Sequence, residues 1–413
     1  MSSVIRSSMP RAETPSTDHA PSAKPLRILM VVDGQYPATG GAEMQVRLLS
    51  ATFARQGHQV QILAPRLYPS QALRETIDGI SVQRIAYPRI KGMGAILLDL
   101  RFAAFLLHRH RDFDAIHIHM MHNLAGAAGW MRRWIRPTMT VKVSGAAEFH
   151  GGILDAALRH KPVHRILNAG ARQIDAVQCI SHYTYQVMQD AGYPASKLHL
   201  VPNAVDCTRF VQAKPDASGN LCVVFVGRHV AVKGLDVLLS AWAALQRPAG
   251  SRLVLAGDGP EHERLRHLAS ELGIADSVEF PGIVTDVPAL LASANLYVQA
   301  SHQEGLPNAV LEAMAAGLPV VATRISGHED VVEHGRTGFL VPPNDPAALA
   351  QAMHSLLADS DQRRDMGKAA RDATEQNFCA DIITHRLLRV YRGTDPTSPA
   401  ADPLPPHTDA SRH

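Results

Sequence analysis

The feature that most constrains the fold of this chain is a unit that repeats along nearly its whole length: a short apolar run, a loop and a helical segment. The runs 26–32 and 221–226 show no polar–apolar alternation, which is typical of strands buried on both faces of a sheet. Helical segments such as 93–110 and 235–245 follow such runs. Strands that alternate with helices in both halves predict an α/β fold of parallel sheets wrapped by helices.

The length of the chain predicts two domains, because 413 residues exceed what one hydrophobic core usually holds. Both ends are rich in proline or serine, so we expect them to be disordered, and the first lacks the apolar centre of a secretion signal. The predicted organisation is a disordered tail 1–25, an N-terminal domain 26–206, a C-terminal domain 207–377, a helix 378–393 that crosses back to the first domain, and a disordered tail 394–413.

The cysteines and the apolar runs favour a protein of the cytoplasm. Four scattered cysteines form no C-x-x-C pair, so we interpret all of them as buried thiols in a reducing compartment: Cys179, Cys207, Cys222 and Cys379. No apolar run approaches the roughly 20 residues that span a bilayer. We therefore expect a cytoplasmic protein, either free or resting peripherally on the inner face of a membrane.

Charge is unevenly distributed, although the formal net charge is only +3. Basic residues outnumber acidic ones in 26–206, and the reverse holds in 207–377. This pattern suggests that the first half meets an anionic partner, and chance segregation is the alternative. We expect no nucleic-acid partner.

Part of the basic half is a candidate membrane surface. Helix 93–110 carries Ile96, Leu100 and Leu107 on one stripe, and the cluster 132–136 adds three arginines and a tryptophan. Apolar and basic side chains in such a mixture are typical of surfaces that rest on anionic lipid. The alternative is an ordinary solvated face with a few exposed apolar residues.

The loop 227–234 is a candidate phosphate site in the second half. It follows an apolar strand, precedes a helix, and carries Arg228 and Lys233 between two glycines. Arginine can grip phosphate oxygens with two hydrogen bonds and lysine supplies a point charge, so together they can neutralise a diphosphate. The alternative is a solvated basic loop.

The stretch 301–319 places two glutamates around the start of a second helix. An apolar run, 294–298, precedes a turn, and the helix 308–316 is predicted to begin at Asn308 as its cap. A helix that starts at the carboxyl end of a strand is where α/β sheets bind anionic ligands.

Glu304 and Glu312 lie eight residues apart in this stretch, the first on the loop and the second inside the helix. The alternative to a binding role is that both are solvated charges. Apolar neighbours flank Glu312, however, and an unpaired carboxylate among them is costly. We therefore expect one carboxylate to face the body of a ligand while the other reaches along it.

The first half offers weaker candidates. Gly41 lies at a strand-to-helix turn, but the spacing is not that of a nicotinamide-binding fingerprint. His119, at the end of a strand, is expected to line the cleft, and Ser144 opens a glycine-rich loop that contains Glu148. Four histidines between 108 and 119 lie on different elements, so we do not expect a metal site.

A series of motifs resembles glycosyltransferase family 4 (group 1), a family of retaining glycosyltransferases with the GT-B fold. The similarity covers most of 26–391, and the motifs occur in the order seen in the family. They are V-P-N-A-V-D at 201–206, G-R at 227–228 with K-G at 233–234, G-D-G-P at 257–260, the E-x7-E helix of Glu304 and Glu312, and G-R-T-G-F-L-V at 335–341. The resemblance implies two Rossmann-like domains with parallel sheets that face each other across a cleft.

The resemblance also implies a role for each matching residue. The nucleotide-sugar donor would lie in the C-terminal domain and the acceptor against the N-terminal one. Arg228 and Lys233 resemble the pair that binds the diphosphate, Glu312 the residue that binds the ribose, and Glu304 the one that contacts the transferred sugar. Further donor contacts are implied for Gly41, Asn203, Val284, Leu306, Pro307 and Asn308.

One departure concerns the acceptor side, where many members of the family carry histidine and this chain has Ser144. Either Glu148 or His150 replaces that group, or no such group is needed. The D-x-D at 112–114 precedes a strand of the wrong half, so no catalytic metal and no cofactor are expected.

These observations predict a retaining, metal-independent glycosyltransferase. It would move a sugar from a UDP- or GDP-sugar onto a glycan or a lipid-linked acceptor in the assembly of a cell-surface polysaccharide or glycolipid. The alternatives are a nucleotide-sugar epimerase with the same fold and a peripheral membrane protein that has lost catalysis.

Overall fold

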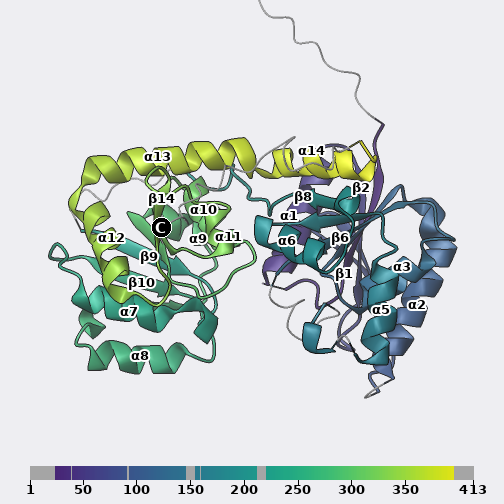
Figure 1. The fold of residues 1–413 in the computed structure, drawn as a ribbon, viewed down its shortest axis with the longest axis horizontal. Helices are drawn as coiled ribbons and strands as arrows, with labels where there is room; N and C mark the ends of the chain where they lie inside the picture. Colours follow the sequence, from purple (N-terminus) through teal and green to yellow (C-terminus); the bar gives the residue numbers. More distant parts are fainter. Residues whose placement is uncertain are drawn as a thin grey trace, which may run out of the picture.

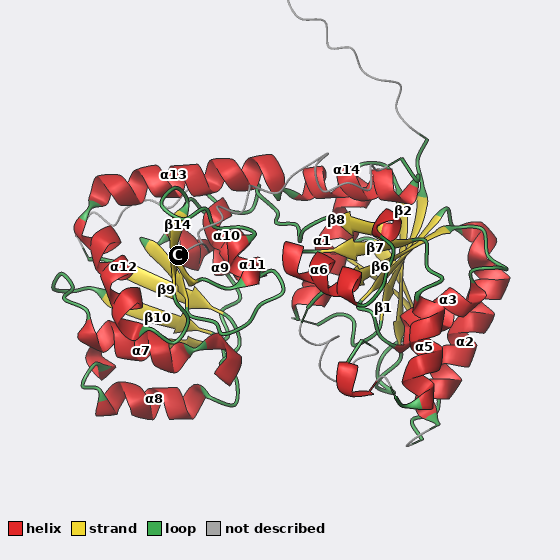
Figure 2. Ribbon diagram, in the orientation of Figure 1, coloured by secondary structure: helices red, strands yellow, loops and turns green. Residues whose placement is uncertain are grey.

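A computed structural model describes residues 24–38, 40–90, 93–145, 154–158, 160–211 and 220–394. It shows two α/β domains side by side, each built on its own sheet (Figure 1). Helices cover both faces of each sheet (Figure 2). The predicted fold class, GT-B with two Rossmann-like domains, is confirmed.

The first sheet has eight strands in the order β3-β4-β2-β1-β5-β6-β7-β8, and every neighbouring pair is parallel except β3 and β4. Its central strands are buried on both faces, as their continuous apolar runs predict. The bounds of its elements, in chain order, are β1 Arg27–Val32, α1 Gly41–Arg55, β2 Gln59–Pro65, β3 Arg74–Ile77, β4 Ile80–Ile85, α2 Gly94–Arg109, β5 Ala115–His119, α3 Asn123–Met131, β6 Thr138–Val143, α5 Pro162–Ala171, β7 Ala176–Cys179, α6 His182–Asp190 and β8 Leu198–Leu200.

The second sheet has six parallel strands in the order β11-β10-β9-β12-β13-β14. The bounds of its elements are β9 Cys222–Val226, α7 Leu235–Ala244, β10 Arg252–Ala256, α8 His262–Glu271, β11 Val278–Gly282, α9 Val287–Ala292, β12 Leu296–Gln299, α10 Asn308–Ala315, β13 Val320–Thr323, α11 Ser326–Glu329, β14 Gly338–Val341, α12 Pro346–Ala358 and α13 Ser360–Asn377. Within the described part of the chain, no helix is both long enough and apolar enough to cross a membrane.

The chain crosses between the domains twice, and the two crossings run next to each other. The first follows β8, and the second joins α13 to the last helix, α14 (Ala380–Tyr391), which packs on α1 (Figure 1). Val205 donates its amide hydrogen to Phe378 O over 2.9 Å and accepts one from Ala380 over 2.9 Å. This pair of backbone bonds joins the two crossings at the junction between the domains.

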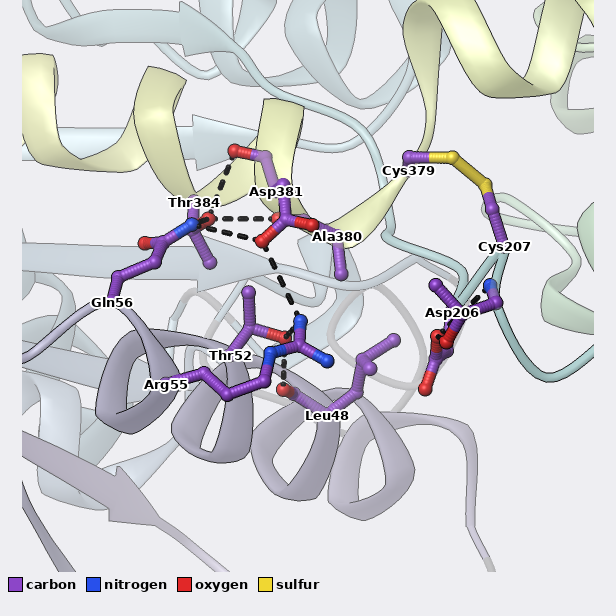
Figure 3. A network of polar contacts seen from close by, with 11 residues as sticks. Leu48, Thr52, Arg55, Gln56, Asp206, Cys207, Cys379, Ala380, Asp381 and Thr384 are labelled. Carbon is purple, nitrogen blue, oxygen red and sulfur yellow. Dashed lines mark hydrogen bonds and ion pairs between the residues drawn. A yellow bond between two sulfur atoms is a disulfide. The ribbon is translucent and has the colours of Figure 1, made fainter.

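A disulfide between Cys207 and Cys379 reinforces the same place (Figure 3). The two residues lie 172 positions apart in the sequence, but their Cα atoms are 5.6 Å apart because each sits on one of the paired crossings. The prediction of four thiols was therefore wrong for these two cysteines. Cys179 and Cys222 are buried free thiols, and burial raises the pKa of both.

Polar contacts beside the disulfide fasten the start of α14 to the end of α1 (Figure 3). The Gln56 amide donates to Asp381 over 3.1 Å and to Thr384 over 2.8 Å, and Arg55 lies 3.5 Å from Asp381. The last helix is thus anchored to the first domain although the chain has just left the second.

Candidate functional site

The site forms at the carboxyl edge of the second sheet, where the strand order reverses. β9 pairs with β10 on one side and with β12 on the other, so the loops that follow β9 and β12 start side by side. Such a switch point is where open parallel sheets bind their ligands. The backbone confirms the contact between the loops, because His302 donates its amide hydrogen to Val232 O over 2.8 Å.

The two loops bring Lys233 and Glu304 into direct contact. Lys233 Nζ lies 2.5 Å from Glu304 Oε1, and the exposed fractions of the two side chains are 21% and 13%. The same carboxylate oxygen accepts hydrogen bonds from Gln299 Nε2 over 2.7 Å and from Ser301 Oγ over 2.8 Å. Three donors therefore fix the position of Glu304 and compensate for its partial removal from water.

Gln299 and Ser301 were not among the predicted site residues. Both are buried, and both lie at the end of an apolar strand within five residues of Glu304. A buried polar side chain needs a hydrogen-bond partner. Polar residues at the end of an otherwise apolar run were therefore the signal that could have identified them.

Arg228 is an exposed residue on the loop after β9. Backbone bonds hold this loop in shape, since His229 donates to Asp258 O over 2.9 Å. A Cβ atom on Gly257 would lie only 1.8 Å from Gly227 O, so a residue with a side chain cannot replace this glycine without moving the loop. The G-D-G-P motif therefore buttresses the loop of the two predicted cations.

The helix after the second loop, α10, begins as predicted at Asn308, but this residue does not cap it. Pro307 occupies the cap position, and no side chain accepts a bond from the first turn. The Asn308 side chain is committed elsewhere: its Oδ1 accepts hydrogen bonds from Asn203 over 2.9 Å and from Gln45 over 3.3 Å, and its Nδ2 donates to Gly41 O over 3.2 Å. The amide hydrogens at the start of α10 are thus left without a capping side chain.

These bonds connect the second domain with α1 and with the crossing between the domains. Asn203 also donates to Leu306 O over 3.0 Å, and Gln45 exchanges two hydrogen bonds with the backbone of Ala204 over 2.7 and 2.8 Å. The structure therefore brings together the predicted residues Gly41, Asn203, Leu306 and Asn308. Gln45, which reaches them from a helix in the first domain, was missed.

Glu312 lies one turn further along α10. Burial raises its pKa to about 7, and the positive charge of Arg209 acts in the opposite direction. This carboxylate is near the midpoint of its titration at neutral pH, so a ligand that donates hydrogen bonds to it would favour the ionised form.

The first domain approaches this edge with its backbone. A Cβ atom on Gly305 would lie 2.2 Å from Ser144 O, and one on Gly145 would lie 2.9 Å from Gly305 Cα. Ser144 therefore lies against the loop that carries Glu304. Glu148 and His150 lie outside the described residues.

His119 does not line a cleft, contrary to prediction. Its side chain is fully buried and stacks on His117 with 4.4 Å between the ring centroids. Tyr391 of α14 lies 2.6 Å from His117 Nδ1, so the last helix packs on the face of β5 that carries these histidines. Burial lowers the pKa of His119 well below its usual value and keeps the ring neutral.

Two further predictions concern the rim of the site and metal ions. Val284 is half-buried in the loop between β11 and α9. Over the ranges that the structure describes, no three potential metal ligands gather closely enough to hold an ion.

Sequence comparison divides the chain between two family profiles. Residues 208–373 match the family described as glycosyl transferases group 1, and residues 39–209 match the one described as glycosyltransferase family 4.

Individual relatives agree with these profiles. The chain is 32% identical over 283 residues to the putative colanic acid biosynthesis glycosyltransferase WcaL of Escherichia coli, covering 65% of this chain and 68% of the relative. It is 28% identical to a GDP-mannose-dependent phosphatidylinositol monomannoside mannosyltransferase of Mycobacterium tuberculosis, covering 89% of this chain and 99% of the relative.

Solved structures share the fold. A sucrose-phosphate synthase from Thermosynechococcus elongatus superposes with a TM-score of 0.74 at 23% identity, covering 89% of this chain and 98% of that structure. Anabaena Alr3699/HepE in complex with UDP-glucose superposes with a TM-score of 0.71 at 21% identity, covering 89% and 100%.

Proposed function

Since the chain belongs to glycosyltransferase family 4, whose members are retaining glycosyltransferases, we propose that it moves a sugar from a UDP- or GDP-sugar onto a glycan or a lipid-linked acceptor. The acceptor would belong to the assembly of a cell-surface polysaccharide or glycolipid. The observation that carries the proposal is the contact of Lys233 with Glu304 at the switch point of the second sheet, beside the start of α10.

The donor would bind with its diphosphate between the loop after β9 and the start of α10. Lys233 and the exposed Arg228 would supply positive charge, and the uncapped start of α10, next to Leu306, Pro307 and Asn308, would attract the anion. Glu304, held by its three donors, would accept hydrogen bonds from hydroxyls of the transferred sugar. Glu312 would do the same for the ribose.

The remaining donor contacts would come from the rim of this site. Val284 would hold the base through its backbone, and Gly41 and Asn203 would contact the donor from the other side of the cleft. The bonds of Asn203 to Leu306 and Asn308 support this proposal.

Catalysis would rest on positioning and on stabilising charge. As the bond from the sugar to the diphosphate breaks, negative charge grows on the leaving phosphate, where Lys233 and Arg228 can stabilise it. The oxygen of the acceptor hydroxyl would form its bond to the anomeric carbon on the face from which the diphosphate departs, and the leaving phosphate would take the hydroxyl proton, so the configuration is retained. Neither a metal ion nor a cofactor is required for this step, and Ser144 and Glu148 are the acceptor-side candidates.

The functions of relatives support the choice of substrates. One is named as a GDP-mannose-dependent enzyme that acts on a phosphatidylinositol mannoside, one as a colanic acid enzyme, and one structural neighbour binds UDP-glucose. A lipid-linked acceptor agrees with a cytoplasmic enzyme that works peripherally at the inner face of a membrane.

A thermal-shift screen against UDP, GDP and their common sugar derivatives tests this function. The chain is expected to be stabilised by one nucleotide family, and Glu304→Gln should reduce the added stabilisation by the nucleotide sugar more than that by the free nucleotide. Acceptor-independent conversion of the stabilising donor into an epimer would contradict the transferase assignment, as would a chain that binds none of these compounds.

A further inference from the structure

The outer face of the first domain carries large apolar side chains that no other part of the described chain covers. Helices α2, α3 and α5 pack beside one another on the side of the first domain that is remote from the second (Figure 1). Their inner sides join one core cluster with β1, β5 and β6, so their outer sides all point away from the same face of the sheet. Eight exposed side chains on or next to these helices define what we name the apolar face: Met93, Ile96, Leu100, Leu107, Trp130, Trp134, Val163 and Ile166.

α2 shows most clearly why this face is unusual. Its buried side consists of Leu98, Phe102 and Leu106, yet Ile96 and Leu100 on the opposite side are 54% and 61% exposed. A surface helix normally turns a polar side to water, and a helix that is apolar all round is normally buried. The stripe identified in the sequence is therefore the outward side of α2.

Contacts between the three helices show that their exposed residues lie close together on one surface. Trp130 Nε1 donates to Ile166 O over 3.0 Å, which joins the end of α3 to α5. The Arg136 amide lies 3.3 Å from His110 Nδ1, which brings the segment of Trp134 to the end of α2. Trp130 thus joins α3 to α5, and the segment that follows α3 joins it to the end of α2.

The charges among these side chains are almost all of one sign. In the segments 93–112, 123–136 and 160–172 the sequence contains two carboxylates. Burial with the nearby charge of Asp33 raises the pKa of Asp99 to about 7, and Asp112 forms an ion pair with Arg109. The exposed cations of the three segments are Arg101, Arg111, Arg133, Arg136, Lys161, Arg165 and Arg172. A protein partner of ordinary composition would find few carboxylates to pair with here.

We propose that the apolar face docks on a lipid bilayer that contains anionic lipids. Tryptophan and aliphatic side chains would enter the boundary between headgroups and acyl chains, while the surrounding arginines and Lys161 would meet lipid phosphates. The attraction of these cations to an anionic surface adds to the gain from burying the apolar side chains. This inference deepens the proposed membrane location and rests on it, but the donor site does not depend on it.

Vesicle co-sedimentation of the full chain tests the proposal. The wild type is expected to bind vesicles of phosphatidylcholine mixed with phosphatidylglycerol, and to bind vesicles of phosphatidylcholine alone at least about tenfold more weakly. The double variant Ile96→Glu/Leu100→Glu should reduce binding to the mixed vesicles at least about tenfold, since it places two carboxylates on the centre of the face. The control Leu272→Glu, an exposed apolar residue after α8 of the second domain, should leave binding unchanged.

Two readouts keep the test decisive. Thermal shift with the stabilising nucleotide, measured on the same samples, should be equal in the wild type and the double variant; this shows that the fold and the donor site are intact, so a failure here is distinct from a failure of the transferase proposal. Sedimentation velocity should show the same oligomeric state for both. The proposal is overturned if mixed vesicles do not bind the wild type, if Ile96→Glu/Leu100→Glu binds them as the wild type does, or if the wild type is a dimer that the variant converts to a monomer.

Discussion

The two edges that meet between the domains are built differently. The edge of the second sheet presents charged side chains that already engage one another, with Glu304 held by Lys233, Gln299 and Ser301. The described part of the opposite edge contributes mainly backbone, at Ser144 and Gly145, and neutral amides such as Gln45. The edge of the second sheet therefore holds its charged side chains in place through contacts within the protein, whereas the edge of the first sheet determines how closely the two domains approach.

This difference predicts that substitutions at the charged edge affect chemistry, while substitutions at the disulfide and at the amides between the domains affect stability and the positions of the domains. The largest effect is expected for Lys233→Ala. It removes the ion-pair partner of Glu304 and the charge that stabilises the leaving phosphate, so kcat/KM for the identified donor should fall by about 10²–10³. The control Lys368→Ala removes an exposed lysine of α13 and should keep wild-type kinetics. If Lys233→Ala keeps the wild-type kcat/KM, the charged edge does not act in the chemistry and the contrast between the two edges fails.

Loss of the disulfide should affect stability first. In the oxidised chain, Cys207→Ser is expected to lower the free energy of unfolding by about 2–4 kcal/mol, because the bond constrains a long segment of the unfolded chain. Denaturant titration of both proteins measures this difference. With a reductant present, the wild type should unfold at the same denaturant concentration as Cys207→Ser. If reductant leaves the wild-type transition unchanged, the disulfide does not contribute in solution.

Glu312→Gln sharpens the comparison through pH. The folded-state pKa of Glu312, about 7, lies above its ordinary value of 4.5, so the proton stabilises the folded chain below pH 4.5 and this stabilisation is lost as the pH rises through 7. Above pH 7 the variant should be more stable than the wild type, by up to about 3 kcal/mol, and the difference should disappear below about pH 4.5.

As the pH rises, the affinity of the wild type for the nucleotide should change in the opposite direction to its stability. The wild type needs the ionised carboxylate to accept hydroxyl hydrogens, so its affinity should rise as the pH passes through 7, while Glu312→Gln shows no such rise. Chemical denaturation and calorimetry across this pH range measure both quantities. A variant that binds with the wild-type pH profile would exclude a role for Glu312 in ligand binding.

The smallest effect is expected at the amides between the domains. Asn308→Ala removes bonds to Asn203, Gln45 and Gly41 that are neutral and partly exposed, so kcat/KM should fall only about threefold to tenfold. The matched control is Asn377→Ala, whose amide donates to Ala373 O within its own helix. A loss as large as that of Lys233→Ala would show that the two edges do not differ in the way described.

The contrast also explains what the sequence could and could not predict. Arg228, Lys233 and Glu304 lie on short loops after neighbouring strands, so local pattern and strand order suffice to place them at one edge. The disulfide, the burial of His119 and the reach of Gln45 depend on the crossings and on α14, which bring distant segments together. Whether the apolar stripe of α2 faces the core or the solvent could not be decided from its spacing alone, because both sides of the helix are apolar.

A crystal structure with whichever of UDP and GDP stabilises the chain tests the central claim most directly. The account predicts that the diphosphate lies between Lys233 Nζ and the first amide hydrogens of α10, with Arg228 turned toward it and the ribose hydroxyls on Glu312. A diphosphate bound anywhere else, with the Lys233–Glu304 pair undisturbed and Glu312 distant from the ribose, would contradict it.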